Sequence, residues 1–215
     1  MPSNSQFNLY HEHFLELLNL GNDFNIAQFQ RILSETFNKI GSESFIIDFV
    51  APFVSFVGLS WENEDISIAT EHFCSDQIIK FIHKINLNIH RSEGSPKILL
   101  TTIPNESHAI GVAMAESIIS LNGGHCLPLS SETPHEEIVK AAIFSNCNIV
   151  GLSFSGHIES NIEEASLLKI RNTLPTEIDL WVGGNPSGNK IADVTYLHLK
   201  DIKNQLNEWR LKNIV

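Results

Sequence analysis

Lys97-Ile98-Leu99-Leu100-Thr101 is followed, after three residues, by Asn105-Glu106-Ser107-His108-Ala109-Ile110-Gly111. These two segments together indicate the fold class of the chain. The first part is a short apolar run of the kind that forms a buried strand. The second part places an acid two residues before a histidine and a glycine three residues after it. An alanine-rich helical pattern then runs from His108 to Leu121. The stretch therefore predicts a strand, a polar loop and a helix, the repeating unit of an α/β fold.

The same alternation continues to the end of the chain. Strands are predicted at Ile98–Leu100, Cys126–Leu127, Asn148–Leu152, Asp179–Val182 and Val194–Leu197. Further helices are predicted after Pro134, at residues 161–172 and at residues 199–211. Strands that alternate with helices form right-handed crossovers and a parallel sheet with helices on both faces. The expected fold class is therefore α/β, with a doubly wound, five-stranded parallel sheet.

The first part of the chain has helical periodicity instead. Apolar residues recur at helical spacing up to Gly21, from Ile26 to Ile40, from about Glu43 to Leu59, and from Asp65 to about Leu87. Pro52 predicts a kink or a break in the third of these helices. Helices joined by short connections form an antiparallel four-helix bundle. The polar stretch Asn88–Pro96 then reads as a linker, so we expect a helical domain at residues 1–92 and an α/β domain at residues 93–215.

Composition excludes several classes of function. The 215 residues include only 14 Lys and Arg, which are scattered, and the formal net charge is −11. Because DNA affinity depends on clustered basic residues, direct nucleic-acid binding is not expected. Three cysteines without a C-x-x-C pair predict neither a disulfide scaffold nor a zinc site. No signal peptide or apolar run of about 20 residues stands out, so we expect a cytoplasmic protein without a membrane segment.

Glu106 and His108 are the strongest candidates for a metal-binding site. A metal-bound imidazole normally donates its other N–H to a carboxylate, which fixes the tautomer of the ring. Glu106 is placed for that role, and Gly111 leaves space where a bulky ring can approach the backbone. The alternative is a surface loop whose polar residues cap the following helix.

Small and polar residues follow the predicted strands. Ligands in doubly wound sheets bind at the carboxyl ends of the strands, where His108 is also expected. A slot lined by hydroxyl groups and bare backbone there would suit a heterocyclic tail, and its candidate residues are Ser153, Ser155, Gly183 and Gly184. The alternative is that these are ordinary turn residues.

A second cluster lies upstream, in the predicted helices. Gly58-Leu59-Ser60-Trp61 is followed by Ala69-Thr70-Glu71-His72. Trp61, Glu71 and His72 are candidates for covering a flat metal-containing cofactor. The alternative is that Trp61 belongs to the core and that Glu71 and His72 are solvated.

Together these motifs resemble a cobalamin-binding module, a helical cap followed by a flavodoxin-like or Rossmann-like domain. The family pattern D-x-H-x-x-G, S-x-L and G-G is matched by Glu106–Gly111, Ser153–Ser155 and Gly183-Gly184. The segment from Trp61 to Glu71-His72 resembles, more specifically, the cap motif of CarH/LitR-type photoreceptor regulators of the MerR family. The resemblance covers about residues 24–200.

The resemblance implies a role for each candidate. His108 would be the lower axial ligand of cobalt, supported by Glu106. Ser153, Ser155, Gly183 and Gly184 would line the slot for the dimethylbenzimidazole tail. Trp61, Glu71 and His72 would shelter the upper ligand, with adenosylcobalamin expected rather than methylcobalamin.

The chain departs from the family pattern at three positions. Glu106 replaces aspartate, Ser155 replaces leucine, and Glu62 stands where the regulators carry a histidine that caps cobalt after illumination. No helix-turn-helix motif precedes the cap, so we expect signalling through a protein partner, a transcription regulator. Related regulators assemble through this module, which makes a homo-oligomer an open expectation.

The expected function is that of a cobalamin-binding sensor that is not itself an enzyme and responds to light or to adenosylcobalamin. One alternative is a corrinoid carrier protein of a methyltransferase system. Another is a degenerate module that binds haem or another tetrapyrrole through His108.

Overall fold

The computed structural model describes residues 4–89, 94–129 and 131–213, which divide into two compact units, Met1–Asn88 and Ile89–Val215. The boundary expected between residues 92 and 93 lies outside the described residues. Each unit is taken by itself below, and the domain limits stay a prediction.

The described part of the N-terminal unit consists of helices joined by short turns. Its helices are α1 (Asn4–Asn22), α2 (Ile26–Ile40), α3 (Ser42–Ser44), a π-helical stretch (Phe45–Val50), α4 (Ala51–Glu62) and α5 (Ile68–Asn88). Its core is rich in aromatic side chains, and the fully buried ones are Phe14, Phe29, Phe45, Phe49 and Phe53. These rings pack edge to face, tilted or stacked against one another; Phe14 meets Phe49 edge to face with ring centroids 5.4 Å apart, and Phe45 stacks on Phe49.

Pro52 does not break the third predicted helix, which runs continuously from Ser42 to Glu62. The turn before Pro52 is π-helical, and the Ala51 N–H donates to the carbonyl of Ile46, five residues back. A proline lacks an N–H and its ring collides with the carbonyl four residues earlier in an α-helix. The wider π turn is one way in which a helix accommodates such a local disruption.

The helix Ser42–Glu62 is also long and apolar enough to cross a membrane by length and composition, and an 18-residue window within it has a mean hydropathy of 1.6. The expectation that no apolar run approaches that length was therefore wrong. Three of its phenylalanines, Phe45, Phe49 and Phe53, are fully buried within the helical unit. Burial in the core of the helical unit accounts for part of this apolar composition, since 44% of the apolar window is buried.

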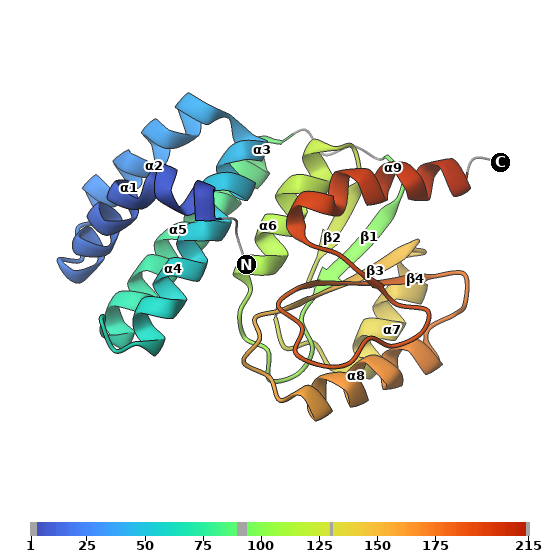
Figure 1. Ribbon diagram of the computed structural model, residues 1–215. Coiled ribbons are helices and arrows are strands. Elements are labelled where there is room, and N and C mark those ends of the chain that lie inside the picture. The colour runs from blue at the N-terminus through green and yellow to red at the C-terminus, as the bar shows by residue number, and fades with distance from the viewer. Residues whose placement is uncertain (1–3, 90–93, 130, 214–215) are drawn as a thin grey trace. The chain divides into compact units, whose positions relative to one another are not determined.

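The C-terminal unit is an α/β sandwich around one parallel sheet (Figure 1). The strands lie in the order β2-β1-β3-β4-β5, and all neighbouring pairs are parallel. The strands are β1 (Lys97–Thr101), β2 (His125–Pro128), β3 (Ile149–Phe154), β4 (Asp179–Gly184) and β5 (Thr195–Tyr196). The helices are α6 (Ile110–Leu121), α7 (His135–Phe144), α8 (Ser160–Thr173) and α9 (Ile202–Lys212). The predicted fold class is confirmed, and its strand order is that of flavodoxin-like sheets.

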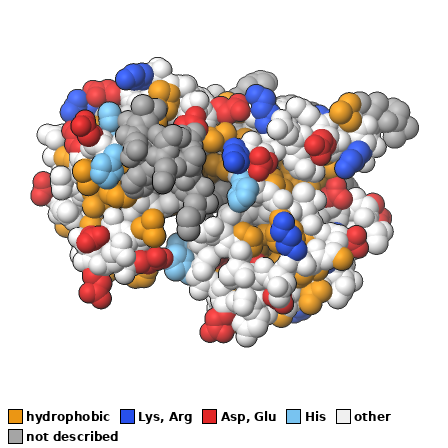
Figure 2. Space-filling model, viewed as in Figure 1, with side chains coloured by type: hydrophobic (Ala, Val, Ile, Leu, Met, Phe, Trp, Pro, Cys, Tyr) orange, Lys and Arg blue, Asp and Glu red, His pale blue; other side chains and the backbone are white. Residues whose placement is uncertain are grey.

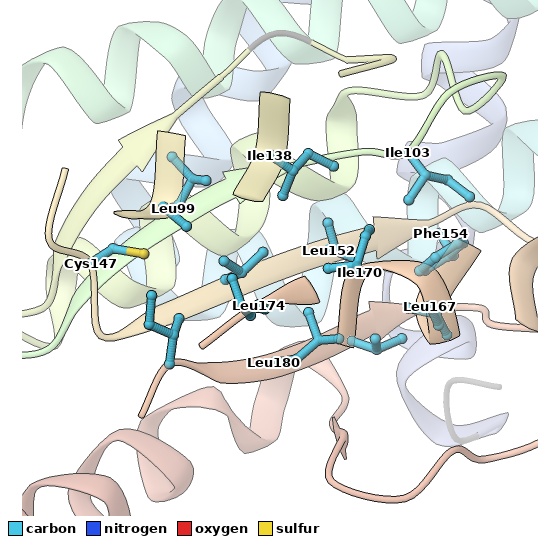
Figure 3. Packing of buried hydrophobic residues seen from close by; sticks show 14 of the residues in the cluster. Leu99, Ile103, Ile138, Cys147, Leu152, Phe154, Leu167, Ile170, Leu174 and Leu180 are labelled. Atoms are coloured by element: carbon cyan, nitrogen blue, oxygen red, sulfur yellow. The ribbon is translucent and has the colours of Figure 1, made fainter. Parts of the chain in front are cut away.

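The two faces of the sheet carry different helices. The core between the sheet and helices α7 and α8 includes Leu99, Leu152 and Leu180 from the strands and Ile138 and Ile170 from the helices (Figure 3). Helix α6 packs against β1, β2, β3 and α9 on the other face (Figure 1). The crossover after β1 therefore leaves on one face and the crossover after β3 on the other. The carboxyl edge between β1 and β3 is thus the switch point where ligands bind in such sheets.

Two strands are longer than the sequence predicted. Ser153 pairs with Gly183 and Phe154 with Gly184, so both ladders continue for two residues beyond the expected ends. Ser153 is therefore the last but one residue of β3, and Gly183 and Gly184 are the last two residues of β4, rather than residues that follow a strand. Only Ser155 follows its strand directly.

Two adjacent glycines at this edge are expected to differ in their tolerance of a side chain. Gly184 has a φ of +87°, and a Cβ there would lie 2.1 Å from the carbonyl oxygen of Phe154. The Cβ of an alanine at Gly183 would meet nothing closer than 3.5 Å. We expect Gly184→Ala to lower the free energy of unfolding by at least ~1–2 kcal/mol. Gly183→Ala should leave it nearly unchanged, and urea denaturation of the two variants measures the difference. Equal stability of the two variants would contradict this geometry.

Candidate functional site

The loop between β1 and α6 turns Glu106 toward the interior. Asn105 has a φ of +68°, a left-handed conformation that asparagine tolerates. The Glu106 N–H donates to the carbonyl of Ile103 at 3.1 Å, which closes the turn. The Thr102 hydroxyl donates to the carbonyl of Glu106 from the start of the loop. The Glu106 side chain is consequently only 1% exposed.

The Glu106 carboxylate accepts hydrogen bonds at both oxygens. Its Oε1 accepts from the His108 backbone N–H at 3.1 Å and lies 2.7 Å from His108 Nδ1. Its Oε2 accepts from the backbone N–H and the hydroxyl of Ser155, at 2.8 and 2.7 Å. Ser155 follows β3, the strand beside β1. The carboxylate therefore ties together the loops that leave two adjacent strands.

These hydrogen bonds keep Glu106 ionised. Burial by itself raises the pKa of this carboxyl, but the hydrogen bonds from His108 and Ser155 outweigh it and bring the pKa to about 2. An ionised carboxylate only accepts hydrogen bonds, so His108 donates from Nδ1. In the neutral form of His108 the lone pair of the imidazole is then on Nε2, the nitrogen that faces away from Glu106.

His108 is half exposed, with 52% of its side chain accessible. It does not cap a helix, because α6 begins at Ile110 and its N-cap, Ala109, makes no side-chain capping bond. The helix predicted from His108 thus starts two residues later. The alternative interpretation of this loop as a cap is wrong, and the arrangement matches the carboxylate–imidazole pair of a metal ligand.

The low pKa of Glu106 makes an expected contribution to stability at neutral pH. The pKa is about 2 in the folded protein, against an ordinary value of 4.5. Because it is depressed on folding, the stabilisation is fully present above about pH 4.5 and is lost as the pH falls toward 2. Glu106→Gln should remove this pH dependence. The difference in free energy of unfolding between wild type and variant should therefore become smaller as the pH falls from about 4.5 toward 2. Chemical denaturation at a series of pH values measures it, and a constant gap would contradict the ionised hydrogen-bonded carboxylate.

The structure adds one residue that sequence reasoning missed. The ring of His157 stacks on that of His108, with centroids 5.0 Å apart and an interplanar angle of 19°. His157 Nδ1 also lies 3.1 Å from the Ser155 hydroxyl. The sequence did contain a signal for this contact, because His157 comes just after β3, the strand that pairs with β1. The Ser155 contact with Glu106 was not predicted either.

Small residues gather on the face of the sheet that α6 covers. Alternation along β3 and β4 places Ser153 and Gly183 on the face opposite the core of Figure 3, and these two residues are register partners. A Cβ on Gly111 would lie 2.1 Å from Ser153 Oγ, so glycine lets α6 approach β3. Trp181, on the same face, is buried, and its Nε1 has no hydrogen-bond partner among the described residues. This face thus offers bare backbone, a hydroxyl and an unused N–H donor.

The cap candidates lie in the helical unit. Trp61 is 37% exposed near the end of α4, so it is not a core residue of that unit. Glu71 lies in the first turn of α5 and His72 follows it, with Glu71 Oε2 2.5 Å from His72 Nδ1. The Ser75 hydroxyl donates to Glu71 Oε1 at 2.6 Å. This second carboxylate–imidazole pair leaves His72 exposed, and its role stays a prediction.

The surface charge is dispersed. On the face shown in Figure 2, Lys and Arg side chains are scattered among acidic ones rather than gathered in a patch. Within the described residues there is also no group of three or more His, Cys, Asp or Glu that could hold a metal ion. Cys74, Cys126 and Cys147 are buried free thiols.

The resemblance to photoreceptor regulators is confirmed by comparison with known proteins. The chain is 27% identical over 139 residues to the HTH-type transcriptional repressor CarH of Myxococcus xanthus. The match covers 63% of this chain and 45% of that protein, so the chain spans less than half of the relative's length. No protein-family model matches the chain.

One solved structure supports the same fold. The monomethylamine corrinoid protein of Methanosarcina barkeri superposes with a TM-score of 0.73 at 15% identity, covering 93% of this chain and 99% of that one. The chain has the fold of a corrinoid protein. A cobalamin-binding protein from Desulfitobacterium hafniense DCB-2 also matches, with 18% identity over 91% of this chain, but its TM-score of 0.40 is too low to bear on the fold.

Proposed function

We propose that this chain binds cobalamin in its α/β unit, with Nε2 of His108 as the lower axial ligand of cobalt. The observation that carries the proposal is the pairing of His108 with the buried Glu106 carboxylate. This pairing leaves a lone pair on Nε2 at the switch point of the sheet. The CarH resemblance and the corrinoid-protein fold support the same conclusion.

The residues present fit this cofactor. Cobalt in a corrin already has four ring nitrogens and needs only one nitrogen ligand from the protein below it, which matches a single oriented imidazole. The nucleotide tail of a cobalamin is an aromatic heterocycle, and the sheet face around Ser153 and Gly183 carries no bulky side chains at that register pair. We assign that face to the tail, together with Gly184 at the strand end. Ser155, although its hydroxyl already donates to Glu106, borders the same edge.

The finer proposal is a sensor of adenosylcobalamin or of light that acts through a transcription regulator. When bound, adenosylcobalamin supplies a cobalt–carbon bond that light breaks. Trp61, Glu71 and His72 would bind the upper ligand in one arrangement of the helical unit better than in another. A ligand shifts such an equilibrium only by its difference in affinity for the two states. A transcription regulator as protein partner and assembly of this chain into a homo-oligomer are part of the same proposal.

A corrinoid carrier is the second candidate function. The specific observation in its favour is the match to the monomethylamine corrinoid protein, which covers nearly the whole of both chains. Glu62, in place of the histidine of the light-responsive regulators, also fits a carrier. Both candidates share the lower ligand and differ in the upper one.

One experiment separates the two candidates. The purified protein is mixed in the dark with adenosylcobalamin or with methylcobalamin, desalted, and its absorbance is recorded before and after green light. Retained adenosylcobalamin whose spectrum changes irreversibly on illumination supports the sensor. Retention of methylcobalamin alone supports the carrier. Failure to retain either corrinoid would refute cobalamin binding and leave haem or another tetrapyrrole to be tested.

A further inference from the structure

We propose that His157 is a positioning residue for His108, holding the axial imidazole by its face while Glu106 holds it by its edge. This inference rests on the proposed cobalamin binding. It assigns a role to a residue outside the motifs that suggested that function.

The hydrogen bonds fix the direction of each proton in the cluster. Glu106 is an acceptor only, so the Ser155 hydroxyl, 2.7 Å away, gives its one proton to Oε2. Toward His157 the same hydroxyl can then only accept. It accepts from the His157 backbone N–H at 3.3 Å and from ring Nδ1, which must carry a proton, at 3.1 Å. In their neutral forms His157 and His108 therefore share one tautomer, with the proton on Nδ1 and the lone pair on Nε2.

The stacking restricts a motion that Glu106 alone leaves open. A single hydrogen bond at Nδ1 fixes one point of the His108 ring but allows the ring to tilt about that point. The nearly parallel His157 ring, 5.0 Å away, opposes such a tilt. A ligand atom is effective when it is held within about 10–20° of its productive direction. His157 thus reduces the conformational freedom that His108 would lose on binding cobalt.

His157 also secures the Ser155 hydroxyl on Glu106. Without the ring N–H of His157, the Ser155 hydroxyl loses one of the partners that orient it. Four groups in sequence are then coupled: His157, Ser155, Glu106 and His108. Because His157 is exposed, its replacement is not expected to disturb folding by more than about 0.5 kcal/mol.

Three variants separate the two contributions. His157→Phe keeps an aromatic ring for stacking but has no N–H. His157→Asn places a side-chain N–H near the position of Nδ1 but has no ring. His157→Ala has neither. His125→Ala is the matched control, because His125 begins β2 at the opposite, amino edge of the same sheet.

The first measurement uses the protein without cofactor. Two-bond ¹H–¹⁵N correlation spectra report the tautomer of each histidine, and we expect Nδ1–H for both His108 and His157 in the wild type. In His157→Ala, Glu106 still holds the proton of His108 on Nδ1, but the ring resonances of His108 should shift and broaden because the ring is freer to tilt. The control should leave them unchanged.

The second measurement is the dissociation constant for adenosylcobalamin, obtained by equilibrium dialysis in the dark. We expect about tenfold weaker binding for His157→Ala, as for other groups that orient a metal ligand. His157→Phe and His157→Asn should each recover about threefold of this loss. An affinity of His157→Ala within about twofold of wild type, or ring resonances of His108 that stay unchanged, would overturn the inference alone. Failure of the wild type itself to bind would overturn the proposed function and this inference with it.

Discussion

His108→Ala is expected to weaken cobalamin binding by about 100-fold or more, which corresponds to ~2.7 kcal/mol. The variant removes the nitrogen that is proposed to coordinate cobalt from below. It also leaves Glu106 without the donor at 2.7 Å, although Ser155 still occupies the other carboxylate oxygen. Equilibrium dialysis against adenosylcobalamin in the dark measures the loss.

His125→Ala serves as the control for a histidine removed from the same unit. His125 lies in β2 at the amino edge, opposite to the strand ends that present His108. Its affinity for cobalamin should equal that of the wild type. If His108→Ala bound as tightly as His125→Ala, with the same absorbance spectrum, His108 would not be the axial ligand.

Glu106→Gln is expected to lower cobalamin affinity about 10- to 100-fold, the usual cost of removing the carboxylate behind a metal-bound histidine. Glutamine has nearly the same shape, but one of its two terminal groups is an NH₂ donor. In the wild type each carboxylate oxygen accepts from two donors, those of His108 on Oε1 and those of Ser155 on Oε2. In the variant one of these two pairs of donors would face the NH₂ group. His108 is then free to place its proton on Nε2, which removes the lone pair from the proposed ligand atom.

Glu163→Gln is a matched control, since Glu163 is a second buried carboxylate of the same unit. It lies in α8, is 1% exposed, and accepts from the Ser187 N–H at 2.8 Å. Its replacement should change stability but not cobalamin affinity. Equal losses of affinity in the two variants would mean that general destabilisation, and not the orientation of His108, explains the result for Glu106.

The sequence predicted the fold well because the α/β unit follows local rules. Short apolar runs alternate with helical patterns, and this alternation led to the five parallel strands that the structure contains. Strand ends were less accurate, since Ser153 and Gly183 lack side chains that mark a strand and are held by ladder pairing with each other. The helix through Pro52 was expected to kink or break because proline disrupts an α-helix. The π turn that keeps this helix continuous leaves no local sequence signal.

The candidate site was predictable only where its residues are neighbours in the chain. Glu106 and His108 share one loop, so their spacing already indicates a hydrogen bond. Ser155 is 49 residues from Glu106, and only the adjacency of β1 and β3 brings them together. The same adjacency of β1 and β3 brings His157 next to His108, and no sequence motif indicated this contact. The sequence left open whether Trp61 is a core residue. Its exposed fraction of 37% shows that it is not.

The most direct test of cobalamin binding through His108 is electron paramagnetic resonance of bound cob(II)alamin in protein labelled with ¹⁵N-histidine. A histidine nitrogen on cobalt splits each line into a doublet, because the ¹⁵N nucleus has spin one half. The tail of an unlabelled cobalamin would give a triplet through its ¹⁴N. We predict a doublet in the wild type that disappears in His108→Ala. A triplet in the wild type, or a doublet that persists in His108→Ala, would contradict the assignment of His108 as the axial ligand.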